Sequence, residues 1–214
     1  MTTLIVVRHG QSQSNLDRRF TGQLETPLTE LGHLQAEATA TLLANTKIDA
    51  IYSSDLSRAI ETAKHTAHGR GLPIIQRPAL REVNAGAWEG KLYDELRAQF
   101  GEGYERWIKD IGHAHPDGGE SVLELYARVN AEVDRIVAEN PEKCVAIFTH
   151  ATPVRMLACR WFGIPPERAA EVPFCTNASV STIEYLGNGK TQLLRYGYDA
   201  HQGEHTTNLP RGLV

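Results

Sequence analysis

Short continuous apolar runs alternate along the chain with segments whose apolar residues recur at helical spacing. A continuous run is typical of a strand buried on both faces of a sheet, and such runs occur at residues 4–7, 50–52, 73–75 and 144–148. Apolar residues three or four positions apart predict helices at residues 31–42, 56–67, 122–136 and 153–162. Thr29 and Ser121 are the predicted N-caps of two of these helices, and Glu124 completes a capping box with Ser121.

The order of these elements predicts the fold class. Strands that alternate with helices indicate an α/β fold, a three-layer α/β/α sandwich with a mostly parallel central sheet. Two further strands at 180–186 and 192–196, joined through Gly187-Asn188-Gly189, predict a hairpin that forms an antiparallel edge. We expect one domain over residues 1–214, with a small helical cap inserted at about 88–120. The aromatic residues of that insertion either cover a pocket or pack locally.

Composition narrows the class of protein. The 214 residues are 41% hydrophobic and 22% charged, with a formal net charge of -4, so neither a disordered chain nor a nucleic-acid or membrane partner is expected. The three cysteines, Cys144, Cys159 and Cys175, are odd in number and widely spaced, which favours a reducing compartment over a disulfide framework or a zinc site. No signal peptide or membrane span is expected, and we predict a cytoplasmic protein.

Charged and imidazole side chains follow several of the predicted strands. Arg8 and His9 come directly after the first apolar run, and His150 comes directly after the run at 144–148. In a parallel sheet, ligands bind beyond the carboxyl ends of the strands, so the two imidazoles face one pocket if these strands are neighbours. Arg58 and Glu82 occupy comparable positions at a helix start and after the third strand.

This set of side chains suits phosphate chemistry. Guanidinium groups bind phosphate oxygens bidentately, and preorganised cations stabilise the charge of a phosphoryl-transfer transition state. A histidine kept neutral by neighbouring cations can act as a nucleophile, and a carboxylic acid can protonate the leaving oxygen. Taken singly, Arg58 could be a solvated helix residue, Glu82 could pair with Arg81 or Arg77, and Gly22 could be a turn glycine. His113, His115 and Asp117 lack a third spaced histidine or cysteine, which disfavours a metal site.

Four segments carry a resemblance to a known family. They read RHGQSQSN, SSDLSRAIETA, LREVNAGAWEG and THATPVR, and GQLETPLTELG and GGES fall in the expected order between them. In this order the segments resemble the signatures of the histidine phosphatase superfamily, the phosphoglycerate-mutase-like proteins, over nearly the whole chain. Within that superfamily the chain looks most similar to the metal-independent phosphoserine phosphatases.

The resemblance implies a role for each matching residue. His9 would be the phosphorylated nucleophile, Glu82 the proton donor, and Arg8, Arg58 and His150 the groups that hold the phosphoryl group. Further phosphate and substrate contacts would come from Asn15, Thr21, Gly22 and Ala151, the last of which stands where the family usually has glycine. The family uses no metal and no further cofactor is expected, so the resemblance implies a metal-independent phosphoric monoester hydrolase of the histidine acid type.

The substrate and assembly are less constrained. We expect a small phosphorylated metabolite, with phosphoserine first and a sugar phosphate or broad specificity next. The alternatives are a 2,3-bisphosphoglycerate-dependent phosphoglycerate mutase, a metal-dependent hydrolase and a catalytically silent phospho-ligand binding module. The Val83-Asn84 segment resembles the phosphatases more than the mutases, which carry an Arg-His-Tyr-Gly run there. A homodimer could form through the edge of the terminal hairpin.

Overall fold

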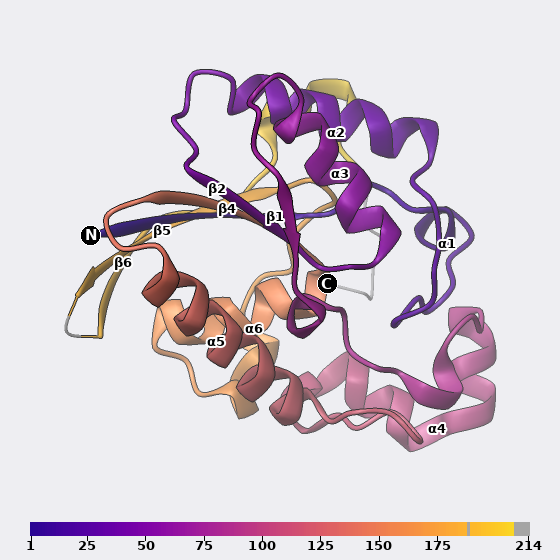
Figure 1. Cartoon of the computed structure of the whole chain (residues 1–214). Helices are drawn as coiled ribbons and strands as arrows, with labels where there is room; N and C mark the ends of the chain where they lie inside the picture. Colours follow the sequence, from indigo (N-terminus) through magenta and orange to yellow (C-terminus); the bar gives the residue numbers. More distant parts are fainter. Residues whose placement is uncertain (188, 208–214) are drawn as a thin grey trace.

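A six-stranded sheet runs through the middle of the computed structural model, which describes residues 1–187 and 189–207 (Figure 1). Its order is β3-β2-β4-β1-β5-β6. The strands β3, β2, β4 and β1 pair in parallel, whereas β5 and β6 are antiparallel. Their bounds are Thr2–Arg8 (β1), Ala50–Ser53 (β2), Ile74–Gln76 (β3), Cys144–Thr149 (β4), Val180–Gly187 (β5) and Lys190–Tyr198 (β6). The predicted parallel sheet with an antiparallel edge is confirmed.

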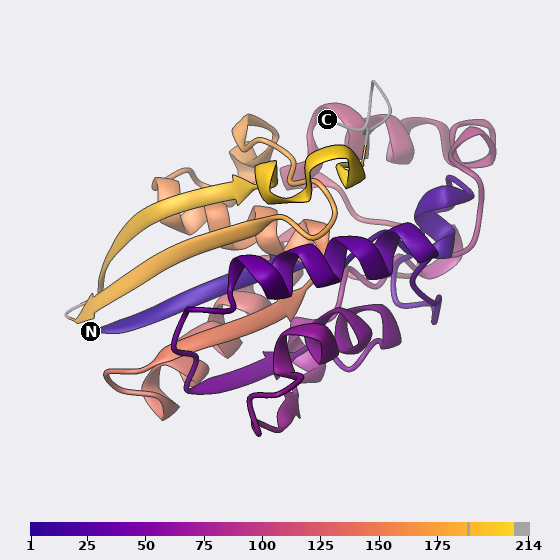
Figure 2. The same ribbon diagram turned by 90° about the horizontal axis from the view of Figure 1, so that it is seen from above.

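Helices cover both faces of the sheet. The helices α2 (Glu30–Leu42) and α3 (Ser57–Ala67) lie on one face, and α5 (Val122–Glu139) and α6 (Ala151–Phe162) lie on the other (Figure 1). The short α1 (Gln13–Leu16) and the longer α4 (Tyr93–Lys109) lie beyond the carboxyl ends of the parallel strands (Figure 2). The 3-10 turns are Pro78–Leu80, Gly86–Trp88, Ile111–His113, Pro166–Glu171 and Ala200–His205. These layers confirm the α/β/α sandwich with a helical insertion.

The first strand shows why a continuous apolar run is needed at the centre of such a sheet. Leu4 and Val6 pack in the hydrophobic cluster on the α5–α6 side, and Ile5 and Val7 pack in the cluster on the α2–α3 side. Successive side chains of a strand point to opposite faces, so a strand covered on both faces must be apolar at every position. All four side chains are buried.

The two predicted N-caps are confirmed, and the last long helix begins earlier than predicted. The Thr29 and Ser121 side chains accept hydrogen bonds from the backbone N–H groups of Gly32 and Glu124, as predicted. The last long helix begins at Ala151, two residues before the predicted start, and His150 is its N-cap. Pro153 is tolerated because the first N–H groups of a helix have no intrahelical acceptor.

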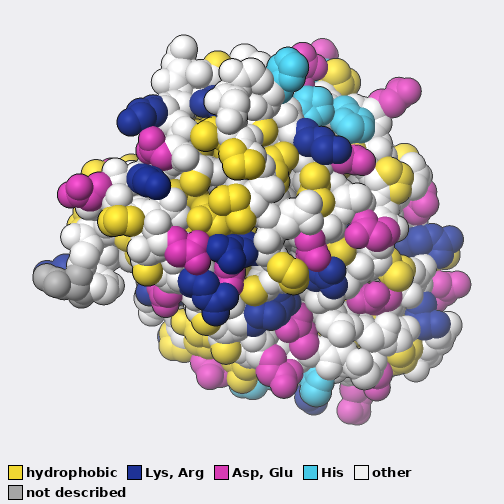
Figure 3. All heavy atoms as spheres, viewed as in Figure 1, with side chains coloured by type: hydrophobic (Ala, Val, Ile, Leu, Met, Phe, Trp, Pro, Cys, Tyr) yellow, Lys and Arg dark blue, Asp and Glu magenta, His cyan; other side chains and the backbone are white. Residues whose placement is uncertain are grey.

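The terminal hairpin forms one edge of the sheet, opposite β3. The strands β5 and β6 pair antiparallel, although Asn188 of the predicted turn lies outside the described residues. The homodimer through β6 stays a prediction. On the face drawn in Figure 3, basic and acidic side chains are interspersed rather than gathered by sign. Across the described residues, no helix is both long and apolar enough to traverse a bilayer.

Two glycines bring the loop after β1 close to the start of α2. A Cβ on Gly10 would collide with the backbone carbonyl of Gly32, and a Cβ on Gly32 would collide with the carbonyl of Gln11. These neighbours are backbone atoms, which cannot move aside as a flexible side chain can. The contact therefore fixes the position of the residue before it, His9, relative to α2.

We predict that Gly10→Ala lowers the free energy of unfolding by about 1–3 kcal/mol, because the added methyl group overpacks a backbone contact. The matched control is Gly103→Ala inside α4, where a Cβ meets nothing closer than 3.5 Å. This control should leave stability unchanged or raise it by up to about 1 kcal/mol, since alanine favours a helix interior. Urea unfolding measures both variants, and equal stability of Gly10→Ala and the wild type would contradict the prediction.

Candidate active site

His9 lies at the carboxyl end of β1, and its ring is held in one orientation. The ring Nδ1 lies 2.6 Å from the carbonyl oxygen of Gly10. Because a carbonyl only accepts hydrogen bonds, Nδ1 carries the proton in the neutral ring and Nε2 keeps its lone pair. The His9 carbonyl accepts hydrogen bonds from the Ala178 N–H and the Asn177 side chain, which fixes the backbone as well.

Two arginines lie beside this ring. Burial, together with the positive charges of Arg58 and Arg8, holds the pKa of His9 well below its usual range. The ring is therefore neutral near pH 7. A neutral imidazole with a free Nε2 lone pair next to two guanidinium groups is the arrangement expected of a nucleophile that attacks a phosphoryl group.

His150 follows β4, and the parallel pairing of β4 with β1 brings it beside His9. The two ring centroids are 5.1 Å apart with the planes at 60°. The His150 Nδ1 accepts a hydrogen bond from Arg58 Nε at 3.2 Å, so its Nε2 carries the proton and donates to Ser54 Oγ at 2.8 Å. Burial and the charge of Arg58 hold the pKa of His150 well below its usual range.

The placement of His150 differs in one respect from the expectation. The cavity at this end of the sheet is lined by His9 but not by His150, which is fully buried behind it. Both of its ring nitrogens already have partners within the protein. A direct contact of His150 with a phosphoryl group, implied by the resemblance, would require the ring to exchange its hydrogen bond with Ser54.

Arg58 and Arg8 are buried groups that line the cavity. Arg58 is 0% exposed, so the alternative interpretation of Arg58 as a solvated helix residue is wrong. Its two terminal nitrogens donate to the carbonyls of Leu24 and Gly22, each at 2.8 Å, and each nitrogen has a second N–H. Arg8 donates through Nη1 to the Cys175 carbonyl. Its Nε is buried without a hydrogen-bond partner among the described residues.

Glu82 faces the same cavity from the segment after β3. One carboxylate oxygen accepts from the N–H of Val83 at 2.8 Å and the other from the N–H of Thr152 at 3.3 Å. The alternative of a surface ion pair is wrong. Arg81 pairs with Asp55, and Arg77 pairs with Glu132 and Glu139.

The Glu82 segment is positioned by a residue of α5. The guanidinium of Arg128 donates to the backbone carbonyls of Ala79, Arg81 and Glu82 and pairs with the Glu120 carboxylate. Arg128 therefore acts on the site through the backbone that carries Glu82. The sequence offered no signal for this role, because one arginine on an amphipathic helix is ordinarily a solvated residue.

The remaining predicted residues also reach the cavity. Asn15, Thr21, Gly22 and Ala151 all line it. Gly22 has a φ of 54°, a conformation that favours glycine, and a Cβ there would also meet the Glu89 side chain. Asn15 Oδ1 accepts from the side chain of Asn177 at 3.0 Å. Asn177 also lines the cavity and was missed, although it lies three residues before β5.

The insertion supplies one wall of the cavity, which has a volume of about 400 Å³. Trp88 is fully buried and packs against Phe20, Phe100, Tyr104 and Trp107. In contrast, the α4 residues Tyr93, Trp107 and Ile108 line the cavity. The aromatic residues of the insertion therefore do both things that the sequence allowed: some pack locally and others cover the pocket.

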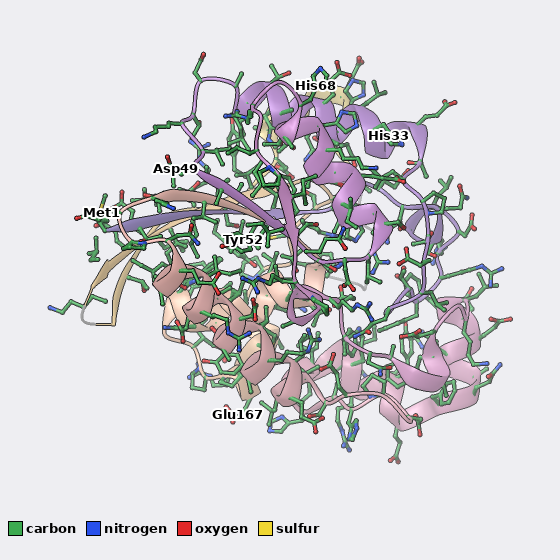
Figure 4. All side chains as sticks on the ribbon, viewed as in Figure 1. Met1, His33, Asp49, Tyr52, His68 and Glu167 are labelled. Atoms are coloured by element: carbon green, nitrogen blue, oxygen red, sulfur yellow. The ribbon has the colours of Figure 1, made fainter. Side chains whose placement is uncertain are left out.

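The histidines outside the site take other positions. His113 pairs with Asp110, His115 contacts the Gly119 carbonyl, and Asp117 accepts from the Trp88 indole N–H. His33 and His68 lie on the α2–α3 side of the sheet, away from α4 (Figure 4). No group of three histidine, cysteine or acidic side chains within residues 1–187 and 189–207 is arranged to hold a metal ion.

Residues 4–198 match the family described as histidine phosphatase superfamily (branch 1), and the chain belongs to that superfamily. It is thus an enzyme of this superfamily, as the motifs predicted. It is 30% identical to Phosphoserine phosphatase 1 of Hydrogenobacter thermophilus, over 95% of this chain and 96% of that protein. It is 31% identical to Probable phosphoglycerate mutase GpmB of Yersinia pestis, over 86% of each. The structure of Bacillus stearothermophilus YhfR matches with a TM-score of 0.91 and 32% identity, over 94% of this chain and all of that one.

We predict that His9 makes the native state sensitive to acid. Above the usual histidine pKa the ring is neutral in both folded and unfolded chains, so it contributes no pH dependence. Below that pKa the unfolded chain binds a proton that the folded chain excludes, and stability falls by up to about 1.4 kcal/mol per pH unit until the folded pKa is reached. His9→Asn, whose amide N–H replaces Nδ1–H, should therefore lose less stability than the wild type between pH 7.5 and pH 5.5.

Urea unfolding at the two pH values measures this difference. The control is His68→Asn, because His68 is exposed on the outer helical layer. This variant should lose as much unfolding free energy between the two pH values as the wild type does. Equal losses in the wild type and His9→Asn would show that the buried imidazole does not resist protonation.

Proposed function

We propose that the chain hydrolyses phosphate monoesters in two steps through a phosphohistidine on His9. The observation that carries this proposal is a neutral His9 with its Nε2 lone pair free, buried beside Arg8 and Arg58. Membership of the histidine phosphatase superfamily and similarity to a protein named Phosphoserine phosphatase 1 support it.

In the first step, His9 Nε2 attacks the phosphorus, a P–N bond forms, and the bond from phosphorus to the ester oxygen breaks. Glu82 in its protonated form gives its proton to the departing oxygen. Arg8 and Arg58 stabilise the charge on the phosphoryl oxygens. Arg8 does so through Nε, which has no partner in the part of the chain that the structure describes, and Arg58 through its second terminal N–H groups.

In the second step, a water oxygen attacks the phosphorus of phospho-His9 while the Glu82 carboxylate removes a proton from that water. The P–N bond breaks, inorganic phosphate leaves, and Glu82 is protonated again for the next cycle. Neither step uses a metal ion or another cofactor. The substrate is a small phosphorylated metabolite, and the name of the relative makes phosphoserine an ester to include in the assays.

The mutase alternative differs in the fate of the phosphoryl group. A mutase returns it to the substrate, whereas a phosphatase passes it to water. After Glu82 this chain has Val83-Asn84-Ala85-Gly86 in place of the Arg-His-Tyr-Gly run of the mutases, which favours hydrolysis. Incubation with 3-phosphoglycerate separates the two reactions, since a phosphatase releases inorganic phosphate and a mutase forms 2-phosphoglycerate.

We predict that His9→Ala abolishes release of inorganic phosphate from a panel of phosphate esters assayed with EDTA, while the wild type keeps its full activity in the chelator. Rapid quenching of the wild type with a ³²P-labelled ester should place acid-labile label on His9. His68→Ala is the control for loss of a histidine outside the site and should retain wild-type turnover. Undiminished turnover in His9→Ala would reject the mechanism, and loss of wild-type turnover in EDTA would point to the metal-dependent alternative.

We predict that Glu82→Gln slows esters of alkyl alcohols about 10²- to 10⁴-fold, the usual contribution of a general acid, and slows 4-nitrophenyl phosphate much less. A nitrophenolate leaves without protonation, whereas an alkoxide does not. Steady-state kcat on the two substrate types measures the difference. If both types slow equally, Glu82 does not protonate the leaving oxygen.

A further inference from the structure

Arg155 is a buried cation of the cavity that the proposed mechanism does not use. It lies in the first half of α6, is 9% exposed and lines the cavity. Its Nε and Nη2 both donate to the Val172 carbonyl, at 3.1 and 2.9 Å. Its Nη1 has no hydrogen-bond partner, and no carboxylate forms an ion pair with it, within the described parts of the chain. A buried guanidinium without an anion is unfavourable, so Arg155 is suited to bind an anionic group of a ligand.

The position of Arg155 separates it from the phosphoryl end. The cations that lower the pKa of His9 are Arg58 and Arg8, and Arg155 is not among them. Arg155 and Arg8 both contact the ring of Phe174, with guanidinium carbons 5.5 and 4.9 Å from the ring centroid. Arg155 and Arg8 therefore contact one aromatic ring of the cavity wall from different segments of the chain.

The wall of the cavity beyond the phosphoryl end is largely apolar. Apart from Phe174, it is formed by aromatic and aliphatic side chains of three segments: Phe20 after α1, the α4 residues Tyr93, Trp107 and Ile108, and Ile111. Such a wall binds apolar surface and leaves the polar groups of a ligand to a few fixed partners. A substrate with only a short polar body would leave this wall in contact with water.

We propose that the cavity binds phosphate monoesters whose organic part joins an apolar ring or chain to a carboxylate, and that Arg155 binds the carboxylate. This inference rests on the proposed phosphatase function and specifies its substrate class. The Nη1/Nη2 end of the Arg155 guanidinium remains available for an anion with two oxygens. A carboxylate is favoured over a second phosphate because its single negative charge is balanced by this one guanidinium. Phosphoserine has the carboxylate but lacks the apolar body.

The test compares esters of primary alcohols, so that the leaving group stays similar. The substrates are 4-carboxybenzyl phosphate, its neutral isostere 4-carbamoylbenzyl phosphate, 4-phosphonobenzyl phosphate and O-phosphoserine. We expect the wild type to have a kcat/KM for the carboxybenzyl ester about 10-fold or more above that for the carbamoyl ester, the effect of one charge-assisted contact, and also above that for phosphoserine. In Arg155→Gln the ratio of kcat/KM for the carboxybenzyl ester to kcat/KM for the carbamoylbenzyl ester should fall to near one.

Two further arginine variants locate the contact. Arg160 lies on the same helix, pairs with Asp134 and does not line the cavity. Arg160→Gln should therefore keep the wild-type ratio of carboxybenzyl to carbamoylbenzyl kcat/KM. Arg18→Gln removes the exposed arginine at the cavity wall. A ratio that falls in Arg18→Gln but not in Arg155→Gln would assign the carboxylate to Arg18 and overturn the proposal.

The remaining outcomes are distinct. A wild-type ratio near one, a preference for phosphoserine, or a preference for the phosphonobenzyl ester would overturn the proposal while leaving the phosphatase function in place. Release of phosphate from none of the esters would instead overturn the proposed function and this inference with it. The wild-type ratio decides between these outcomes even if Arg155→Gln does not yield folded protein.

Discussion

The parallel pairing of β1 with β4 is the constraint on which the site depends, because it places the ends of two strands that are far apart in the sequence next to each other. Arg8 pairs with Thr149 in this register, so the residues that follow, His9 and His150, lie side by side. A shift of one residue in the register would turn the inward-facing side chains of β1 to the other face of the sheet. The pairing continues past the end of the strand, since the His9 N–H donates to the Thr149 carbonyl at 2.9 Å.

The second constraint is the electrostatic state of this strand end. Two arginines and two histidines are buried together with one carboxylate, and the histidines accommodate the excess positive charge by remaining neutral. Hydrogen bonds to Gly10 and from Arg58 then determine which nitrogen of each ring carries the proton. The His9 ring thus turns an unprotonated Nε2 away from its Gly10 partner, whereas the His150 ring is held on both sides by Arg58 and Ser54.

The organic part of a substrate meets a different part of the molecule. The phosphoryl end is built by β1, α3 and the segment after β3, which belong to the sheet and its helices. The opposite wall comes from α4 and from the segment between α6 and β5, both of which lie at the carboxyl end of the sheet. The wall formed by α4 is therefore separate from the segments that carry His9, Arg58 and Glu82, whereas the segment before β5 also holds His9 and Arg8 through hydrogen bonds.

The sequence by itself determined the sheet, the two capped helices and most of the residues that meet at the cavity. Apolar runs, helical spacing and short motifs each involve residues that are close together in the sequence, so they can be recognised without the tertiary structure. Only the tertiary structure decided that His150 lies behind His9 with both nitrogens engaged and that Arg128 positions the Glu82 segment. It also decided that Arg155 lines the cavity with no acidic partner among the residues described. Each of these facts depends on which groups from distant segments are buried together, and burial with a partner decides whether a polar side chain is structural or free to bind a ligand.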